Sequence, residues 1–429
     1  MRFIPVALAA VLLAVSAGCG ESGSAGGSAS AVPEEVAVYL SVDTTFEGDQ
    51  WQAASELLAR FPEGDGALEE ILSEKDLRDA LGPEAVVAVL SGPVDVDGEP
   101  PVVMLTQPDD PDALDRLLEG SDAARAEVRG WQVVADGEEM LDRYREALEG
   151  PSLEGSEPFA EAMDGLPEDA LARLYANGET LLEALPQLSP GLGRSPLGLL
   201  QGEAGGSIGA TLRAEDDGVR VEGRLVAIGE EAAAPEAYES ELAGEVPAGA
   251  IAFVSFDDLG SALERYEELL GGGALVPFGF GELGALFAGE SAIYLGAKGD
   301  ATLVTQVEDE AAALETAEAL LGLAGEDVPV AVDAFDGLLA VSSSERELAA
   351  LRGDGPRLAD DDRFQEALAA AGMPAETTGF GYLDVGPAAP LVHKGPAELR
   401  EYLEPLHGAV FWSEASEDGR RFSLFLGVY

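Results

Sequence analysis

The sequence predicts an α+β protein made of two tandem similar halves, each a mostly antiparallel sheet with helices packed on one face. Three observations lead to this prediction. Apolar strand-like runs are joined by tight turns, which favours antiparallel pairing. Several blocks of the first half return in the same order in the second half. The chain has 429 residues, of which 46% are hydrophobic, so it can bury more than one core.

The repeat is clearest at residues 32–43, which return as residues 246–257 with the same Val-Pro start and a terminal Asp. Four further pairs keep the same order along the chain: 104–107 with 303–306, 130–134 with 337–341, 159–163 with 364–368, and 217–218 with 418–419. Each second block follows its first by about 200 residues, a period far longer than that of a solenoid. A tandem duplication is therefore expected, with halves at 32–230 and 246–429 joined by a helix at 231–245.

Hydrophobic periodicity predicts the elements of the first half in chain order. These are a strand at 36–42, helices carrying Trp51 and then residues 68–72, strands at 85–91 and 101–107 joined by a turn at 95–98, a short helix from Asp110–Pro111, a strand at 130–135, a helix ending near Leu148, a helix around Phe159, a strand at 169–176, a helix at 179–185, and a hairpin turning at 215–218.

A finer pattern places an Asp or Asn ten residues after a Pro at the end of four predicted strands. These terminal residues are Asp43, Asn177, Asp257 and Asp384. Each stands just before a predicted helix, where its side-chain oxygen can accept the first free amide hydrogens. Helix capping is therefore favoured over a metal site for these four positions.

The amino terminus predicts export. Arg2 precedes the apolar run 3–15 and the small residues 16–18, which is typical of a signal peptide at 1–18. The only cysteine, Cys19, follows directly. Residues 15–19 resemble the lipobox of bacterial lipoproteins, although Ser16 stands where that family usually has an aliphatic residue. The resemblance implies that Cys19 carries a diacylglyceryl group, and residues 19–31, rich in Gly and Ser, are expected to form a flexible tether. The alternative is an ordinary secretory signal cut nearby.

The body resembles a bacterial domain-of-unknown-function family of exported, membrane-anchored proteins. The residues that carry the resemblance are the block from Pro33 to Asp43, the helices at Phe159 and Phe364, and the strands that run from Pro to Asp. The resemblance covers nearly all of residues 32–429. It implies an extracytoplasmic location and assigns no catalytic, cofactor or metal residue.

Composition narrows the functional classes. The 82 acidic residues against 24 basic ones give a formal charge of −58, which repels nucleic acids and anionic lipid headgroups. Weak, non-specific binding of divalent cations is expected on such a surface. With two histidines and one cysteine, the chain lacks the side chains of most nucleophilic and transition-metal chemistry.

Two glycine motifs match the patterns of catalytic or nucleotide-binding sites. Residues 205–209 match the G-x-S-x-G pattern around Ser207, but the following residues continue as a strand rather than the helix that a nucleophile elbow requires. Residues 279–284 match G-x-G-x-x-G, but no strand precedes them, as a dinucleotide site requires. Neither motif predicts an enzyme.

Other polar and aromatic groups also have structural interpretations. Residues 95–99 resemble a calcium loop but lack its ligand spacing, and Asp360–Asp362 are placed to complement a helix dipole. His393 and His407 flank a predicted helix at 396–403 with Glu398, Glu401 and Glu404, which predicts no convergent zinc ligands. Trp51, Trp131 and Trp412 are expected in the core.

The sequence therefore predicts a lipid-anchored, extracytoplasmic protein in the bacterial cell envelope that is not an enzyme, with no cofactor. The membrane is contacted through the lipid on Cys19, and the expected partner is a small apolar ligand or an envelope protein. Two alternatives remain: an extracytoplasmic hydrolase acting through paired carboxylates, and a passive structural lipoprotein. A binding protein should carry an apolar pocket or an exposed apolar patch.

Overall fold

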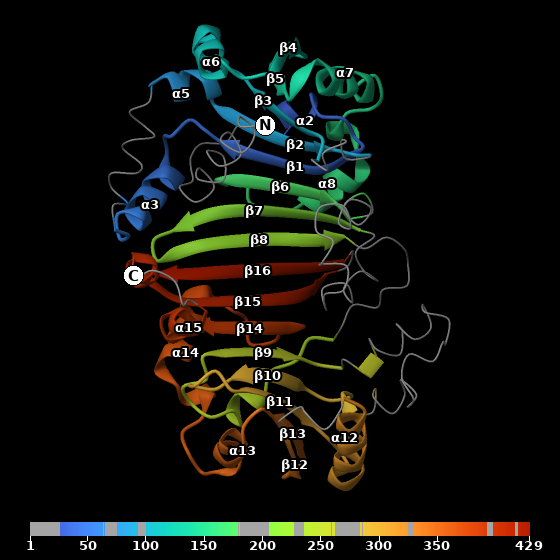
Figure 1. Cartoon of the computed structure of the whole chain (residues 1–429), viewed down its shortest axis with the longest axis vertical. Coiled ribbons are helices and arrows are strands. Elements are labelled where there is room, and N and C mark those ends of the chain that lie inside the picture. Colours follow the sequence, from blue (N-terminus) through green and yellow to red (C-terminus); the bar gives the residue numbers. More distant parts are fainter. Residues whose placement is uncertain are drawn as a thin grey trace. The chain divides into compact units, whose positions relative to one another are not determined.

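The computed structural model (Figure 1) describes residues 26–62, 64, 75–92, 100–178, 180, 206–226, 236–258, 260–261, 284, 286–324, 330–392, 398–416 and 419–429. The chain divides into two units. One comprises Met1–Ala232 with Glu417–Ser423, and the other Ala233–Ser416 with Leu424–Tyr429. Each unit combines helices with an antiparallel sheet, so the predicted α+β class is confirmed.

The first unit is built on strands that pair with one another in an antiparallel sense. Its strands are β1 (Val36–Asp43), β2 (Glu84–Leu90), β3 (Val102–Thr106), β4 (Ala124–Val128), β5 (Trp131–Ala135), β6 (Ala172–Asn177), β7 (Ser207–Glu215) and β8 (Gly218–Val226). Its helices are α2 (Gly26–Ala29), α3 (Asp49–Leu58), α5 (Lys75–Leu81), α6 (Pro111–Leu118), α7 (Gly137–Ala147) and α8 (Glu157–Met163). The strands run in the order β8-β7-β6-β1-β2-β3-β5-β4.

The second unit has its own set of strands. They are β9 (Ala252–Phe256), β10 (Ser291–Leu295), β11 (Ala301–Gln306), β12 (Ala331–Phe335), β13 (Leu338–Ser342), β14 (Gly379–Asp384), β15 (Leu406–Ser416) and β16 (Gly419–Val428). The helices are α12 (Glu310–Ala324), α13 (Glu345–Arg352), α14 (Asp362–Ala371), α15 (Val385–Val392) and α16 (Glu398–Leu403). The order β16-β15-β14-β9-β10-β11-β13-β12 repeats that of the first unit, strand for strand.

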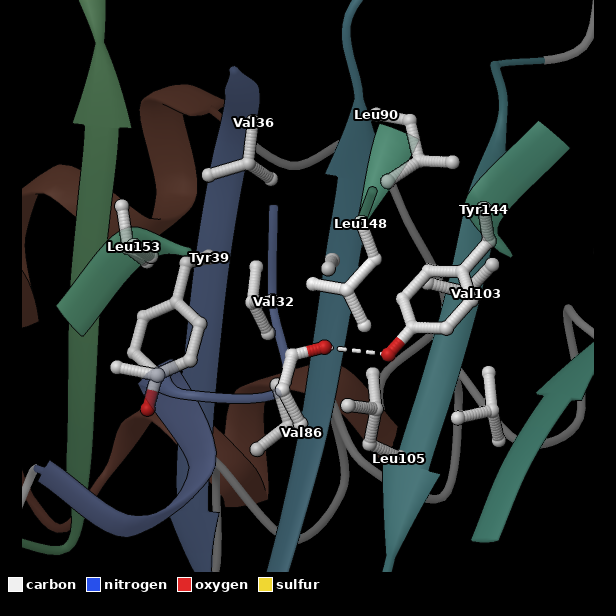
Figure 2. Close-up of a cluster of buried hydrophobic side chains, with 14 of the residues drawn as sticks. Val32, Val36, Tyr39, Val86, Leu90, Val103, Leu105, Tyr144, Leu148 and Leu153 are labelled. Carbon is white, nitrogen blue, oxygen red and sulfur yellow. Dashed lines mark hydrogen bonds between the residues drawn. The ribbon is translucent and has the colours of Figure 1, made fainter. Parts of the chain in front are cut away.

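Helices cover both faces of the first unit's sheet, so the expectation of helices on one face is wrong. Leu141 of α7 and Phe159 of α8 pack with Leu105 in the main core, part of which is shown in Figure 2. Leu114 of α6 packs with Met104 in a separate cluster. Because neighbouring strand residues point to opposite faces, Met104 and Leu105 anchor helices on opposite sides. A strand that is apolar at successive positions needs cover on both faces.

The second unit has the same two-sided cover at one end of its sheet. Leu348 of α13 packs with Leu338 in the main core of this unit, whereas Ala313 and Ala317 of α12 pack with the neighbouring Leu339. The alternating positions 338 and 339 again face helices on opposite sides.

Local sequence signals explain where several elements begin and turn. Asp110 caps α6, since its Oδ1 accepts the amide of Asp112 at 3.0 Å, and Pro111 follows at the start of the helix. Arg129 and Gly130, with φ of 54° and 84°, form the two-residue turn between β4 and β5. Strand β4 is not among the predicted elements, because apolar and charged residues alternate over 124–128 and this stretch buries little apolar surface.

The other predicted elements of the first half are mostly present. The strands at 36–42, 85–91, 101–107, 130–135 and 169–176, the helices at Asp110, before Leu148 and at Phe159, and the hairpin turning at 215–218 are confirmed. The helical residues 68–72, the turn at 95–98 and most of the helix at 179–185 lie outside the described residues.

The N-terminal segment differs from the expected tether of residues 19–31. From Gly26 on, the chain forms the short helix α2 and enters the core, where Ala29, Ala31 and Val32 are fully buried. The Tyr144 hydroxyl donates to the carbonyl of Ala31, and Figure 2 shows Val32 among the core side chains. Small side chains made this segment look like a linker, but the same small side chains let its backbone pack closely against the sheet.

The connecting segment also differs from the helix expected at 231–245. Residues 236–241 are not helical, and Tyr238 forms an isolated bridge with Thr377. One turn of 3-10 helix follows at Leu242–Gly244. The physical reason is that the carboxylate of Glu290 accepts the backbone amides of Glu241 and Leu242, which satisfies them without helical hydrogen bonds.

Candidate functional site

The second unit carries an exposed apolar surface on one face of its sheet. Five large apolar side chains on five strands are between 38% and 47% exposed: Val254, Ile293, Leu383, Phe411 and Leu424. Contiguous patches of this kind mark interaction sites.

The strand register makes these residues neighbours. Val254 of β9 lies opposite Ile293 of β10 on one side and opposite Gly381 of β14 on the other. Gly381 in turn lies opposite Phe411 of β15. Residues in directly opposed positions have their Cβ atoms about 4.5–5.5 Å apart, so the side chains form one continuous surface.

The middle positions of the described central strands carry no charged side chain on this face, whereas the same alternation places His407 of β15 and Arg420 of β16 on it near the strand ends. Strand alternation places these residues together on it: Ala252, Val254, Phe256, Ile293, Leu295, Leu303, Gly381, Leu383, Ala409, Phe411, Leu424 and Leu426. We call this set the apolar face. None of its members is ionisable, although the chain has a formal charge of −58. The intervening residues, such as Phe253 and Tyr294, are buried in the unit's core.

Each unit also contains a glutamate at the start of its second strand, which is buried in the second unit and partly buried in the first. Glu290, just before β10, is 4% exposed and accepts hydrogen bonds from the hydroxyls of Ser240 and Ser255, the latter at 2.6 Å. It also accepts the amides of Glu241 and Leu242 at 2.8 and 2.9 Å. Four donors satisfy this carboxylate, which therefore holds the connecting segment onto the second unit.

Glu84 has the matching position in the first unit, at the start of β2. It accepts the Ser28 hydroxyl at 2.6 Å, and the Ser28 and Tyr39 hydroxyl oxygens lie 2.7 Å apart. Burial raises the pKa of Glu84, against the lowering effect of hydrogen bonds from Ser28 and Ser41. Burial, with the nearby charge of Glu84, raises the pKa of Tyr39 to about 12. This carboxylate holds the N-terminal segment onto the first unit.

A shallow recess lies beside Glu84. Its lining includes the carboxylate-bearing Asp43 and Glu168 together with Arg173, and its volume is about 20 Å³. This is about the space needed for one water molecule. The recess brings carboxylates together, as the hydrolase alternative requires, and it is open to solvent.

The structure places several of the predicted residues. Ser207 begins β7, with its hydroxyl 3.3 Å from that of Tyr175, and the strand continues to Glu215. The arrangement is that of a hairpin, as predicted, and not of a nucleophile elbow. Asp361 caps α14 by accepting the amide of Arg363 at 3.0 Å, which agrees with a helix-terminus role for the acidic run.

Of the four strand-terminal residues, Asn177 accepts the amide of Thr180 at 3.2 Å, as capping predicts. Asp43 instead accepts the amide of Thr45 in a local turn, well before α3 begins. Asp384 is buried and pairs with Arg363 at 3.0 Å. Capping is therefore correct for only part of this set.

The remaining candidates do not converge. The ring of His407 packs on Tyr429 with centroids 4.2 Å apart. Within the described residues, no group of three or more His, Cys, Asp or Glu side chains is placed to hold a metal ion. Trp51, Trp131 and Trp412 are at most 5% exposed, so their predicted core positions are confirmed. Cys19, His393, residues 95–99 and residues 279–283 lie outside the described residues.

Sequence reasoning missed the apolar face and the two hydrogen-bonded glutamates, Glu84 and Glu290. A signal for the face was present, because β9 and β10 read Ala-Phe-Val-Ser-Phe and Ser-Ala-Ile-Tyr-Leu with no charged residue. Such runs predict a strand that is apolar on both faces. The glutamates had no distinguishing signal among the many acidic residues. No described helix has the length and hydropathy needed to span a bilayer.

Comparison with known proteins gives little. No family model matches the sequence, and the curated proteins contain no match either. Among solved structures, one crystal form of TP0453 aligns with a TM-score of 0.24 and 14% sequence identity, over 49% of this chain and 81% of that one. A likeness this weak supports no conclusion about fold or function.

Proposed function

We propose that this chain is a lipid-anchored, extracytoplasmic protein that binds an envelope protein through its apolar face and performs no catalysis. The observation that carries the proposal is the uncharged, exposed sheet surface around Val254, Ile293 and Phe411. The chain as a whole has a formal charge of −58, so this uncharged area differs from the acidic composition of the rest. This area accepts a neutral apolar partner without electrostatic repulsion.

The shape of the face favours a protein partner over a small ligand. Small apolar ligands bind in concave sites that enclose most of their surface. The apolar face is instead spread over neighbouring strands of one sheet, with Gly381 adding no side chain between Val254 and Phe411. A broad surface with aromatic and aliphatic side chains is typical of the central part of a protein interface.

The proposal includes a tandem duplication of one backbone plan. The identical strand order of the two units supports it. So do equivalent local contacts, because the bridge between Pro33 and Ser152 matches that between Pro247 and Arg357. The two hydrogen-bonded glutamates at the start of the second strand, Glu84 and Glu290, add a third correspondence. Duplication lets one copy keep its surfaces closed while the other acquires a binding face.

The anchor is the acylated Cys19, which the sequence pattern at residues 15–19 supports. Two acyl chains on one residue give stable membrane attachment. The protein would then present its binding face to partners at the extracytoplasmic side of a membrane in the bacterial cell envelope.

Photo-crosslinking in intact cells tests the binding proposal. A photoreactive amino acid replaces Phe411 in the full chain, and a matched control replaces the exposed Glu146 of the first unit. We expect a protein adduct from position 411 that is lost on Ile293→Asp and kept on Ile293→Ala, with no such adduct from position 146. A protein adduct that persists in the Ile293→Asp variant would contradict the proposal, and so would the absence of any adduct from position 411. Adducts to lipid alone would replace the protein partner by a small apolar ligand.

The anchor is tested separately by mass spectrometry of the mature amino-terminal peptide. We expect a diacylglyceryl-modified Cys19 at the new terminus and release of the Cys19→Ser variant from membranes. An unmodified cysteine in the membrane-bound chain would contradict lipidation.

A further inference from the structure

We infer that residues 26–32 form a docked strap that holds the first unit close to the membrane, so that the body is not suspended on a long tether. The inference rests on the proposed lipidation of Cys19. It adds a second interaction surface, in which the part of the first unit around the strap faces the lipid surface.

Burial supports the docking of the strap. Ser28, Ala29, Ala31 and Val32 are all fully buried. Val32 belongs to the main core of the first unit, among the residues drawn in Figure 2. Removing these side chains from water is favourable in proportion to their apolar area, so the strap is held by the same forces as the core.

Hydrogen bonds fix the strap along its whole length. The Ser28 hydroxyl donates to Glu84 at 2.6 Å and lies 2.7 Å from the Tyr39 hydroxyl. The carbonyls of Ser30 and Ala31 accept from Arg129 and from the Tyr144 hydroxyl. Arg129 also donates to the carbonyl of Leu148 at 3.2 Å, which ties the strap to the end of α7. Lifting the strap away would leave several of these buried polar groups without partners.

The docked strap sets an upper limit on the reach of the anchor. Only six residues separate Cys19 from Gly26, where the first described helix begins. At about 3.5 Å per residue, the seven steps from Cys19 to Gly26 span about 25 Å even when fully extended. The strap therefore confines the adjacent surface of the first unit to this distance from the acylated residue.

The chain that enters the second unit is held against its sheet in a similar way. Its connecting segment is held by Ser240 and by the amides of Glu241 and Leu242 on the buried Glu290. In each unit, a glutamate at the start of the second strand thus accepts hydrogen bonds from the chain that enters the unit. In the first unit, the incoming chain is the one that leads from the membrane.

Energy transfer measures the distance directly. The full chain, extracted from membranes, is reconstituted into phosphatidylcholine vesicles that contain a headgroup-labelled acceptor lipid. The donor dye is placed on Glu149→Cys, an exposed position next to Leu148. One variant carries ten Gly/Ser residues inserted after Ser22, and a control carries the same insert in the hairpin turn at Asp216–Asp217. The insert raises the root-mean-square reach of the chain between Cys19 and Gly26 from about 15 Å to about 23 Å, and its fully extended limit from about 25 Å to about 60 Å.

We expect efficient transfer with the native spacing, at least a twofold loss with the insert after Ser22, and no change with the control insert. Equal transfer with and without the insert after Ser22, in chains whose lipid is verified by mass, would overturn the inference.

Amide hydrogen exchange tests the docking of the strap independently of the proposed lipid anchor. In the lipid-free Cys19→Ser chain, the amides of Ala31 and Val32 donate to the carbonyls of Ser28 and Ala29, so we expect slow exchange at both. Rapid exchange at these two amides would overturn the docked strap itself. Failure of the full chain to remain on vesicles, with slow exchange preserved, would instead overturn the lipid anchor and with it the membrane-facing surface.

Discussion

The two units have similarly built cores and differ on one outer surface. In the first unit, Leu40 and Val87 form the cross-strand pair that corresponds to Val254 and Ile293 in the second. Val87 is 7% exposed and packs in a cluster with Val42 and Ala172. Ile293, in contrast, is 46% exposed. The same backbone position is thus a covered core site in one unit and part of an open apolar face in the other.

A second pair of corresponding positions, on β7 and β15, shows the same contrast together with a difference in side-chain size. Ala210 of β7 is opposite Leu174, just as Phe411 of β15 is opposite Gly381. Ala210 is 5% exposed and Phe411 is 43% exposed. A small buried residue has its counterpart in a large exposed aromatic one. This difference in exposure is what the proposed binding role of the second unit's face requires.

The two glutamates differ in their hydrogen-bond donors. Glu290 accepts two backbone amides as well as two hydroxyls, whereas the hydrogen bonds that act on Glu84 come from Ser28 and Ser41. At Glu84, the desolvation of the carboxylate outweighs these hydrogen bonds and raises the pKa.

The largest expected effect tests whether the two interiors are equivalent. Phe159 packs edge-on against Tyr39 and Tyr175, and Phe364 packs edge-on against Phe253 and Tyr382. We expect Phe159→Ala and Phe364→Ala each to lower the free energy of unfolding by about 3–5 kcal/mol, because each leaves a cavity. Denaturant titration measures both. A loss below 1 kcal/mol in either unit would break the equivalence.

The next effect sharpens the contrast between the glutamates. Glu290→Gln replaces an acceptor oxygen by an NH₂ group that faces hydrogen-bond donors, so we expect a loss of about 2–3 kcal/mol. Glu84→Gln can keep the Ser28 hydrogen bond through its carbonyl oxygen and avoids a buried charge. We therefore expect a smaller change at neutral pH, and thermal unfolding of both variants checks the order. Equal losses would contradict the distinct roles.

A smaller effect concerns the sheet faces. Ala210→Phe inserts a ring at a covered position, and we expect it to cost about 1–3 kcal/mol. The reciprocal Phe411→Ala removes an exposed ring and should change the free energy of unfolding by less than about 1 kcal/mol. Chemical denaturation of the two variants side by side is the measurement. A costly Phe411→Ala would mean that this ring serves folding.

The smallest effect is a pH dependence whose sign follows from Glu84. Because burial raises its pKa in the folded chain, the folded chain binds this proton more tightly than the unfolded chain does. This contribution to folding stability is complete at pH values below the ordinary pKa range of glutamate. It is lost as the pH rises through the raised pKa of Glu84. The stability of the native chain relative to Glu84→Gln should therefore fall with rising pH. Arg173 and Ser28 moderate the effect, and an opposite slope would contradict the assignment.

Much of the fold could be predicted from local signals. The apolar runs gave the strand positions, and Asp110–Pro111 gave the start of α6. What failed depended on tertiary context. Residues 26–31 have the composition of a linker, yet small side chains also suit a segment packed tightly between a sheet and Tyr144. Strand β4 carries alternating charges and is defined by its pairing with β5 rather than by its own hydrophobicity.

The candidate site was less predictable than the fold. An apolar strand residue reads the same in the sequence whether a helix covers it, as at Leu339, or leaves it exposed, as at Ile293. Only the placement of neighbouring elements distinguishes the two cases. Similarly, Glu84 and Glu290 differ from other acidic residues only through the donors that the fold brings to them.

Hydroxyl-radical footprinting of the apolar face in two settings tests the central claim most directly. Phe411 and Leu424 are exposed in the isolated chain and should be oxidised readily in purified protein. In intact cells, we expect both to be protected by the bound partner, while the partly buried Met140 on α7 of the first unit is labelled equally in the two settings. Equal oxidation of Phe411 and Leu424 in the two settings would contradict a binding role for this face.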